Sequence, residues 1–145
     1  MGSYEQFVQS EIARLGIRKC VEISGYVHSD ELPLLMANCD AFALPYAYTY
    51  QSLSLHKAMA SGSAIVASDV PGFREFIADG KTGLLTRVGD PGDLASKLRW
   101  VYDNPGDAEG LGANARRLAE ERFDLSATAR AHLNIYRDAI RARNG

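Results

Sequence analysis

The stretch that decides the fold lies at residues 44–75 and reads LPYAYTYQSLSLHKAMASGSAIVASDVPGFRE. Its pattern predicts a buried strand ending at Pro45, a polar loop, a helix over residues 52–61 closed by Gly62, and a second buried strand over residues 64–67. A loop that leaves a parallel strand at its carboxyl end and enters a helix directs backbone N–H groups and the positive end of the helix dipole at one point. The stretch is therefore typical of an open α/β sheet with an anion site at one edge.

Strands and helices alternate along the rest of the chain. The strand that ends at Pro45 covers residues 41–44, and further strands are expected at residues 20–24 and 84–86. Further helices are expected at residues 4–15, from a cap at Ser29 onward, and at residues 73–78, 91–102, 107–122 and 125–142. This alternation predicts a parallel sheet with helices on both faces, folded as one domain over residues 4–143. Residues 1–3 have the composition of a cloning remnant and are left out of this prediction.

Composition narrows the function classes. Hydrophobic residues make up 46%, charged residues 23%, and the net charge is −2, so the basic excess of a nucleic-acid-binding protein is missing. No apolar run has the length of a membrane span and the first residues lack a signal-peptide core, which predicts a cytoplasmic protein. Cys20 and Cys39 lack metal-ligand spacing and are expected to be buried free thiols. No nucleophile elbow, phosphate loop of the Walker type or metal cluster is present, so no residue is assigned a catalytic or metal-binding role.

Several motifs in order carry a family resemblance. They are VEISGYV at residues 21–27, KAMASG at 57–62, AIVASDVPG at 64–72 and DGKTGLL at 79–85. Together with Glu75 they resemble the donor-binding segment of the retaining two-Rossmann-domain glycosyltransferases of the GT-B type, family 4. The resemblance covers roughly residues 5–105. It implies a Rossmann-like parallel sheet with helices on both faces, as a partial copy of a GT-B C-terminal domain.

The resemblance also implies a site for a nucleotide-diphospho-sugar, which is the donor substrate, with no further cofactor. The implied donor-binding residues are Gly25, Tyr26, Val27, Thr49, Tyr50, Gln51, Ser52, Leu53, Lys57 and Glu75. In the family the loop at residues 25–27 contacts the base, the N–H groups at residues 49–53 face the diphosphate, and the last Glu supports the loop beside the donor.

Simpler structural roles stay open for the same residues. Gly25 also suits a plain turn, Ser52 a helix cap, Lys57 a solvated surface position and Glu75 a cap of the helix at residues 73–78. The tyrosines at positions 46, 48 and 50 either stack on a base or sugar or pack the loop onto the body of the domain.

Two positions depart from the family pattern. Where the family has two Glu residues, this chain has Thr49 and Lys57. A carboxylate accepts two hydroxyl hydrogen bonds, whereas lysine has donors and no acceptor, so Lys57 cannot replace a ribose-binding Glu in kind. It is suited instead to meet a phosphate as a point charge.

Length sets the remaining alternatives. The 145 residues suffice for one domain, whereas the family's reaction occurs in a cleft between two. If the resemblance holds, two central strands of a sheet ordered 3-2-1-4-5-6 lie outside this chain. A fragment, a differently closed sheet, or a second chain that fills the gap each fits this. The expected partners are an N-terminal acceptor domain or a second chain, and a homodimer is one such arrangement.

Three functions follow from these alternatives. The chain is the donor-binding part of a glycosyltransferase, or a non-catalytic nucleotide-binding or assembly module. The third function, a flavodoxin-like or receiver-like module, ranks last because the acidic cluster of a receiver is missing at the first strand end.

Overall fold

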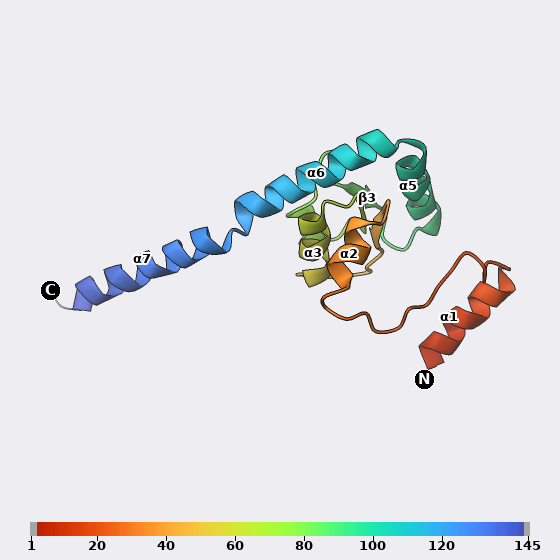
Figure 1. The fold of residues 1–145 in the computed structure, drawn as a ribbon, viewed down its shortest axis with the longest axis horizontal. Helices are drawn as coiled ribbons and strands as arrows, with labels where there is room; N and C mark the ends of the chain where they lie inside the picture. Colours follow the sequence, from red (N-terminus) through yellow and green to blue (C-terminus); the bar gives the residue numbers. More distant parts are fainter. Residues whose placement is uncertain (1–2, 144–145) are drawn as a thin grey trace. The chain divides into compact units, whose positions relative to one another are not determined.

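The structure, a computed structural model, describes residues 3–143 apart from the side chains of Ser3 and Ala127. It divides into two compact units, residues 1–31 and residues 32–145, which are described separately. The single-domain organisation expected over residues 4–143 stays a prediction. The helices are α1 (Ser3–Arg14), α2 (Leu32–Ala37), α3 (Leu53–Ser61), α4 (Pro71–Arg74), α5 (Pro91–Asp103), α6 (Pro105–Arg122) and α7 (Leu125–Arg143), and the strands are β1 (Phe42–Leu44), β2 (Ile65–Ser68) and β3 (Leu84–Thr86) (Figure 1).

The first unit holds α1, as predicted, followed by an irregular segment. Gly16, with φ 70°, ends the helix region. The strand predicted at residues 20–24 is wrong, because these residues have no regular structure and Val21 and Ile23 are 40% and 46% exposed. A short strand needs a neighbour to take its backbone hydrogen bonds, and no strand among residues 3–143 pairs with this segment. Cys20 is a free thiol but exposed, so the prediction that it is buried is also wrong.

The second unit is built on a sheet of three parallel strands in the order β1-β2-β3. Phe42 pairs with Ile65 at the start of the β1 ladder, and Ser68 pairs with Thr86 at the end of the β3 ladder. β2 is the central strand, and all four of its side chains are buried. Each strand lies within one residue of its prediction. The parallel pairing makes all three carboxyl ends meet at one edge of the sheet.

Helices cover both faces of this sheet, as expected. On one face Ile65 and Ala67 belong to a core that includes Leu55 and Met59 of α3 and Ala115 of α6. On the other face Val66 packs with Leu84, with Val101 of α5 and with Leu111 of α6. Helix α6 contributes to both cores, and Figure 1 shows it running alongside α3.

Two helix starts differ from the prediction. The helix expected from Ser29 begins at Leu32, because residues 28–31 form a turn closed by a 3.1 Å bond from Glu31 N–H to the His28 carbonyl. The helix expected at residues 73–78 is the single turn α4, which has Pro71 in its first turn. It stops early because the Ala78 N–H donates to Thr82 Oγ1 at 2.9 Å and the chain turns toward β3.

The remaining helices, α5 to α7, lie where they were expected. Every α7 side chain that the structure describes is exposed. No helix within residues 3–143 has the length and apolarity needed to cross a membrane.

Candidate functional site

The loop from β1 to α3, residues 45–52, lies at the carboxyl edge of the sheet. Thr49 in this loop is buried, and its hydroxyl donates to the Gln51 carbonyl at 2.7 Å. The hydroxyl therefore closes a turn of the loop. The side chain of Thr49, at a position where the resemblance implies a Glu, is therefore used inside the loop itself.

The start of α3 carries the anion-binding geometry that the sequence predicts. Ser52 is the N-cap, with extended φ −140° and ψ 110°, and its Oγ accepts from Leu55 N–H at 3.2 Å. Its carbonyl accepts from His56 N–H at 3.3 Å. Within residues 3–143, the N–H groups of Leu53 and Ser54 have no acceptor. Ser52 thus caps the helix, as its simpler role requires, and still leaves two N–H groups at the positive end of the helix dipole.

Gly72 holds this loop in place. A Cβ atom at Gly72 would lie 2.5 Å from the Tyr50 carbonyl oxygen and 2.6 Å from that of Thr49. Only glycine allows α4 and the loop to approach so closely. The sequence pattern placed Gly72 in a turn, and the close approach to Tyr50 was not predicted, because it joins segments from two different strand ends.

The three loop tyrosines separate into two groups. Tyr46 packs inward, with its ring 5.4 Å from that of Phe73. Tyr48 and Tyr50 are 59% and 77% exposed and form an edge-to-face pair, with ring centroids 4.9 Å apart and an interplanar angle of 79°. Their side-chain hydrogen bond raises the pKa of Tyr48. Packing onto the body of the domain is therefore confirmed for Tyr46, whereas stacking on a base or sugar stays a prediction for the exposed pair.

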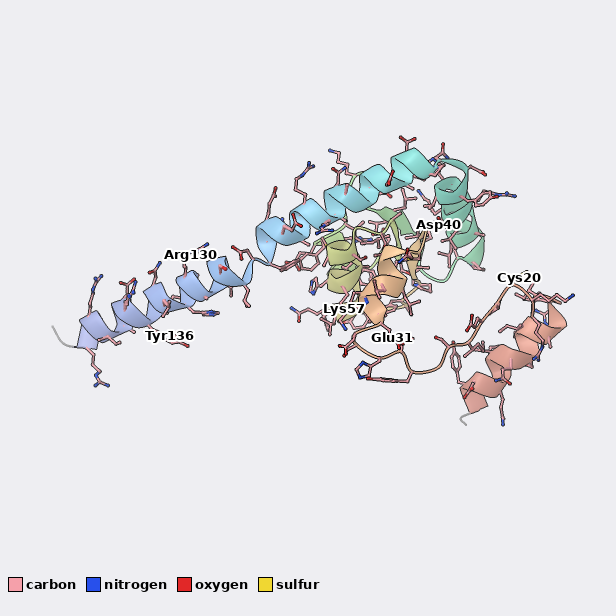
Figure 2. All side chains as sticks on the ribbon, in the orientation of Figure 1. Cys20, Glu31, Asp40, Lys57, Arg130 and Tyr136 are labelled. Carbon is pink, nitrogen blue, oxygen red and sulfur yellow. The ribbon has the colours of Figure 1, made fainter. Side chains whose placement is uncertain are left out.

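Lys57 and His56 lie one turn inside α3 and face different surroundings. Figure 2 shows Lys57 on α3, where it is exposed and, within the described residues, forms no ion pair. His56 packs between the rings of Phe76 and Phe123, at 5.1 and 4.7 Å. A hollow of about 710 Å³ adjoins it, lined also by Ala60, Arg116, Ala119, Glu120, Phe123 and Asp124. Since this hollow lies along α3 and α6, it is separate from the loop.

The other predicted site residues lie in the first unit or at the end of α4. Gly25, with φ 67°, and the 88% exposed Tyr26 belong to the first unit with Val27, so their grouping with the α3 start stays a prediction. Glu75 is exposed at the end of α4, where its carbonyl accepts from Arg122 Nη1 at 3.4 Å. The alternative prediction that Glu75 caps the first turn of this helix is therefore wrong, because α4 begins four residues earlier, at Pro71.

One charged pair at the carboxyl edge of the sheet was not predicted from the sequence. Asp69 follows β2 directly and forms an ion pair with Arg74 of α4, with Nη2 to Oδ2 at 2.9 Å. The hydrogen bond from Arg74 holds the pKa of Asp69 below its ordinary value, against a smaller opposing effect of burial. Among the described residues, no group of three or more His, Cys, Asp or Glu side chains is placed to hold a metal ion.

This fold and this loop define a class: a Rossmann-like domain with free helix-start N–H groups at the carboxyl edge of a parallel sheet. The chain belongs to the family described as "Glycosyl transferases group 1", which matches residues 1–118. The predicted resemblance and fold class are thereby confirmed.

Curated relatives agree with this membership. The chain is 35% identical over 130 residues to the MMP alpha-(1->4)-mannosyltransferase of Mycolicibacterium hassiacum, a match that covers 89% of this chain and 32% of that protein. It is 33% identical to D-inositol 3-phosphate glycosyltransferase 2 of Catenulispora acidiphila, covering 88% of this chain and 30% of that protein. The chain thus spans about a third of the length of such relatives.

Solved structures show the same fold. HepE of Anabaena in complex with UDP matches with a TM-score of 0.86 and 26% identity, over 93% of this chain and 37% of that chain. Its complex with UDP-glucose matches with a TM-score of 0.84 and 25% identity. The C-terminal domain of LpcC, a glycosyl transferase group 1 protein of Francisella tularensis, matches in fold with a TM-score of 0.77 and 20% identity, over 84% of this chain and 63% of that one. The fold is thus a partial copy of a GT-B C-terminal domain.

Proposed function

We propose that this chain is the donor-binding part of a glycosyltransferase that takes a nucleotide-diphospho-sugar and transfers its glycosyl group with retention. The observation that carries this proposal is the pair of N–H groups on Leu53 and Ser54, at the positive end of α3, that have no acceptor within residues 3–143. Such a helix start attracts a diphosphate through hydrogen bonds and through its dipole. Membership of the family and the UDP complexes of the Anabaena neighbour support the same assignment.

The predicted site residues receive roles within this proposal. The N–H groups of residues 49–54 meet the diphosphate, and Lys57 adds a positive charge one turn away. Gly25, Tyr26 and Val27 contact the base, and Glu75 supports the α4 end beside the loop. The donor is the only small molecule that the reaction needs, and no side chain of this chain is assigned a catalytic role.

The acceptor half of the reaction lies on another domain or on a second chain, and a homodimer is one arrangement that supplies it. The comparisons support the first part of this proposal, since the chain covers only 37% of the Anabaena neighbour. Location in the cytoplasm, expected from the sequence, stays a prediction that cell fractionation tests.

A second candidate function is a non-catalytic nucleotide-binding or assembly module. It is favoured by the two replaced carboxylates. The Thr49 hydroxyl donates its hydrogen bond to the Gln51 carbonyl, and Lys57 offers no acceptor for ribose hydroxyls. Sugar transfer after addition of an acceptor domain distinguishes the first function from the second.

The test of the donor site uses proline at the first position of α3. Leu53→Pro removes one N–H group that has no acceptor in the described chain. Proline suits the first helical position, and the extended Ser52 before it is compatible with a following proline. Leu53→Ala, the matched control, removes the same exposed side chain and keeps the N–H group.

Titration calorimetry with UDP, GDP and ADP is the measurement. We expect one nucleotide to bind saturably, and Leu53→Pro to weaken its binding by at least about tenfold relative to Leu53→Ala, since one hydrogen bond to a charged group is lost. Both variants should unfold at wild-type denaturant concentrations. Equal affinities for the two variants would remove the α3 start from the site, and no binding of any of the three at millimolar concentration would contradict the proposed function.

A further inference from the structure

A second hollow lies at the opposite edge of the sheet from the candidate donor loop. It has a volume of about 660 Å³ and is lined by residues 37–40 and 62–64, which precede β1 and β2, and by residues at the end of α5 and the start of α6. All of these residues belong to the second unit. The donor loop follows the carboxyl end of β1, so the length of this strand separates the two places. The volume is within the range of about 300–1,000 Å³ that is usual for small-molecule sites.

The floor of this amino-edge hollow is held by its own hydrogen bonds. The buried Ser63 hydroxyl donates to the Met36 carbonyl, and the Cys39 thiol donates to the same carbonyl at 3.1 Å. These bonds join the segment before β1 to the segment before β2. The shape of the hollow is therefore fixed before a ligand arrives, and little conformational entropy is lost when one binds.

Two carboxylates lie at the amino-edge hollow. They belong to Asp40, labelled in Figure 2, and to Glu109 of α6, and neither forms an ion pair or a side-chain hydrogen bond within the described residues. No Lys, Arg or His is among the described residues that line the hollow. Two negative charges without a cation repel a phosphate or a sulfate. The charge of the lining therefore disfavours an anionic ligand.

The start of α6 adds the opposite electrostatic sign. Its N-cap Asn104 makes no capping bond with its side chain, and the Asn104 Nδ2 atom donates instead to the Trp100 carbonyl at 2.8 Å. Pro105 has no N–H group, and the Gly106 N–H has no acceptor within residues 3–143. Pro105 and Gly106 both line the hollow, so the positive end of the α6 dipole lies there. A cation attracted by the carboxylates would meet this positive end, which disfavours a cationic ligand as well.

A hydroxyl group suits both kinds of partner. It donates to a carboxylate and accepts from an N–H group, so a neutral ligand with several hydroxyls matches the whole lining. Tyr102 of α5 lines the same hollow, is 76% exposed, and offers an aromatic ring with a phenol at its end. The apolar C–H face of a sugar ring packs on such a ring while its hydroxyls exchange hydrogen bonds. A hexose therefore meets requirements that a phosphate or an ammonium ion does not.

We propose that the amino-edge hollow binds a neutral hexose unit of an oligosaccharide. Asp40 and Glu109 accept hydrogen bonds from its hydroxyls, and the Gly106 N–H donates to one of them. Tyr102 packs on the sugar ring. This is a binding site at which no bond is made or broken. The inference does not rest on the proposed function, because none of these residues belongs to the candidate donor site.

The experiment titrates the intact chain with three neutral trisaccharides, built from glucose, mannose or galactose, and follows the backbone amide signals by NMR. Inorganic phosphate and tetramethylammonium chloride are the charged probes. Gly106→Phe is the blocking variant and Gly110→Phe its matched control, since a Cβ atom at either position of α6 meets nothing within 4 Å and, of the two, Gly106 lines the hollow. Tyr102→Ala removes the aromatic ring, with the exposed Tyr136→Ala on α7 as its control. Circular dichroism confirms the fold of each variant.

We expect at least one trisaccharide to shift the amide signals of Ala64, Tyr102 and Gly106 saturably at millimolar concentration and to leave those of residues 49–54 in place. Gly106→Phe should weaken this binding by at least about tenfold relative to Gly110→Phe, because the phenylalanine fills the space of the sugar. Tyr102→Ala should weaken it by about three- to tenfold relative to Tyr136→Ala.

Several results would overturn the inference. One is the absence of binding by all three trisaccharides, and another is a set of shifts confined to residues 49–54. Tighter binding of phosphate or tetramethylammonium than of any trisaccharide would assign the hollow to a charged ligand, and equal affinities of Gly106→Phe and Gly110→Phe would place the sugar elsewhere. The nucleotide titration is a separate measurement, so failure of this site leaves the proposed function standing, and failure of nucleotide binding leaves this site standing.

Discussion

At position 56, α3 places a histidine between two phenylalanine rings. The His56 ring lies 5.1 Å from Phe76 and 4.7 Å from Phe123, and its Nε2 atom is buried with no hydrogen-bond partner within the described residues. A buried polar atom without a partner loses its hydration and gains nothing in return. The structure therefore shows His56 packed between the two rings, with an unfavourable free energy from its buried nitrogen.

Replacing this histidine with leucine should stabilise the protein. His56→Leu removes the unpartnered nitrogen and keeps an apolar side chain against both phenylalanines, so we expect the free energy of unfolding to rise by about 1 kcal/mol. Denaturant unfolding measures it, with the exposed His132→Leu on α7 as the control. A free energy lowered by His56→Leu would mean that Nε2 has a partner in solution.

The Asp69 carboxylate should titrate below its ordinary range, because Arg74 donates to it. A pKa that is lower in the folded protein means that the pair stabilises the fold at neutral pH and that this stabilisation is lost as the pH falls through the folded value. Carboxyl NMR titration measures the pKa, and Arg74→Gln should raise it toward the ordinary value. An Asp69 pKa that does not respond to Arg74→Gln would contradict the ion pair.

Between elements, α6 approaches the end of α3 closely. A Cβ atom on Gly112 would lie 1.9 Å from the carbonyl oxygen of Gly62, the residue that ends α3 with φ 77°. Gly112 therefore allows α6 to approach the end of α3 through its backbone, whereas a Cβ atom on Gly62 would have its nearest contact at 3.7 Å. Residues of both helices pack in the same core against Ile65 and Ala67 of β2. The close approach of α6 therefore helps to hold α3 on this face of the sheet.

Gly112→Ala should force these helices apart. We expect a loss of about 1–3 kcal/mol of unfolding free energy, as is usual for overpacking against a rigid backbone. Gly110→Ala on the same helix is the matched control, because a Cβ there meets nothing within 4 Å. Alanine at Gly110 should stabilise the protein by about 0.5–1 kcal/mol. Equal effects of the two substitutions would show that α3 and α6 are less closely packed in solution.

At the scale of the whole molecule, the buried residues among those that the structure describes are confined to part of the chain. The two cores draw on residues from Met36 to Ala119, and the Phe123 ring closes the cluster around His56. Helix α7 adds no buried side chain among those that the structure describes. The stability of the second unit should therefore come from the residues that precede α7.

Removal of α7 tests this distribution. A chain ending at Asp124 should keep the wild-type free energy of unfolding to within about 0.5 kcal/mol, as for other changes at exposed positions. A chain ending at Leu118 lacks Ala119 and Phe123, which pack in the described fold. Its loss of unfolding free energy should be several times that of the chain ending at Asp124. Denaturant unfolding compares the three chains, and a large loss in the longer truncation would show that α7 packs against the fold.

The sequence by itself determined the features that depend on neighbours along the chain. Ser52 caps α3 and Gly62 ends it because the N-cap bond and the left-handed φ involve only residues within a few positions. The strands at 41–44, 64–67 and 84–86 were predictable for the same reason, since short apolar runs between turn signals mark buried strands. The ordered motifs at 21–85 made the family recognisable without any structure.

Only the tertiary structure decided what depends on contacts far apart in the chain. Residues 20–24 have a strand pattern but no paired neighbour, and a strand exists only with a partner for its backbone. The same holds for the tyrosines, because the packing of Phe73 and the close approach of Gly72 turn Tyr46 inward and leave Tyr50 facing solvent. Local propensity is uniform along such a loop, and the long-range contacts decide which side chain is available for a ligand.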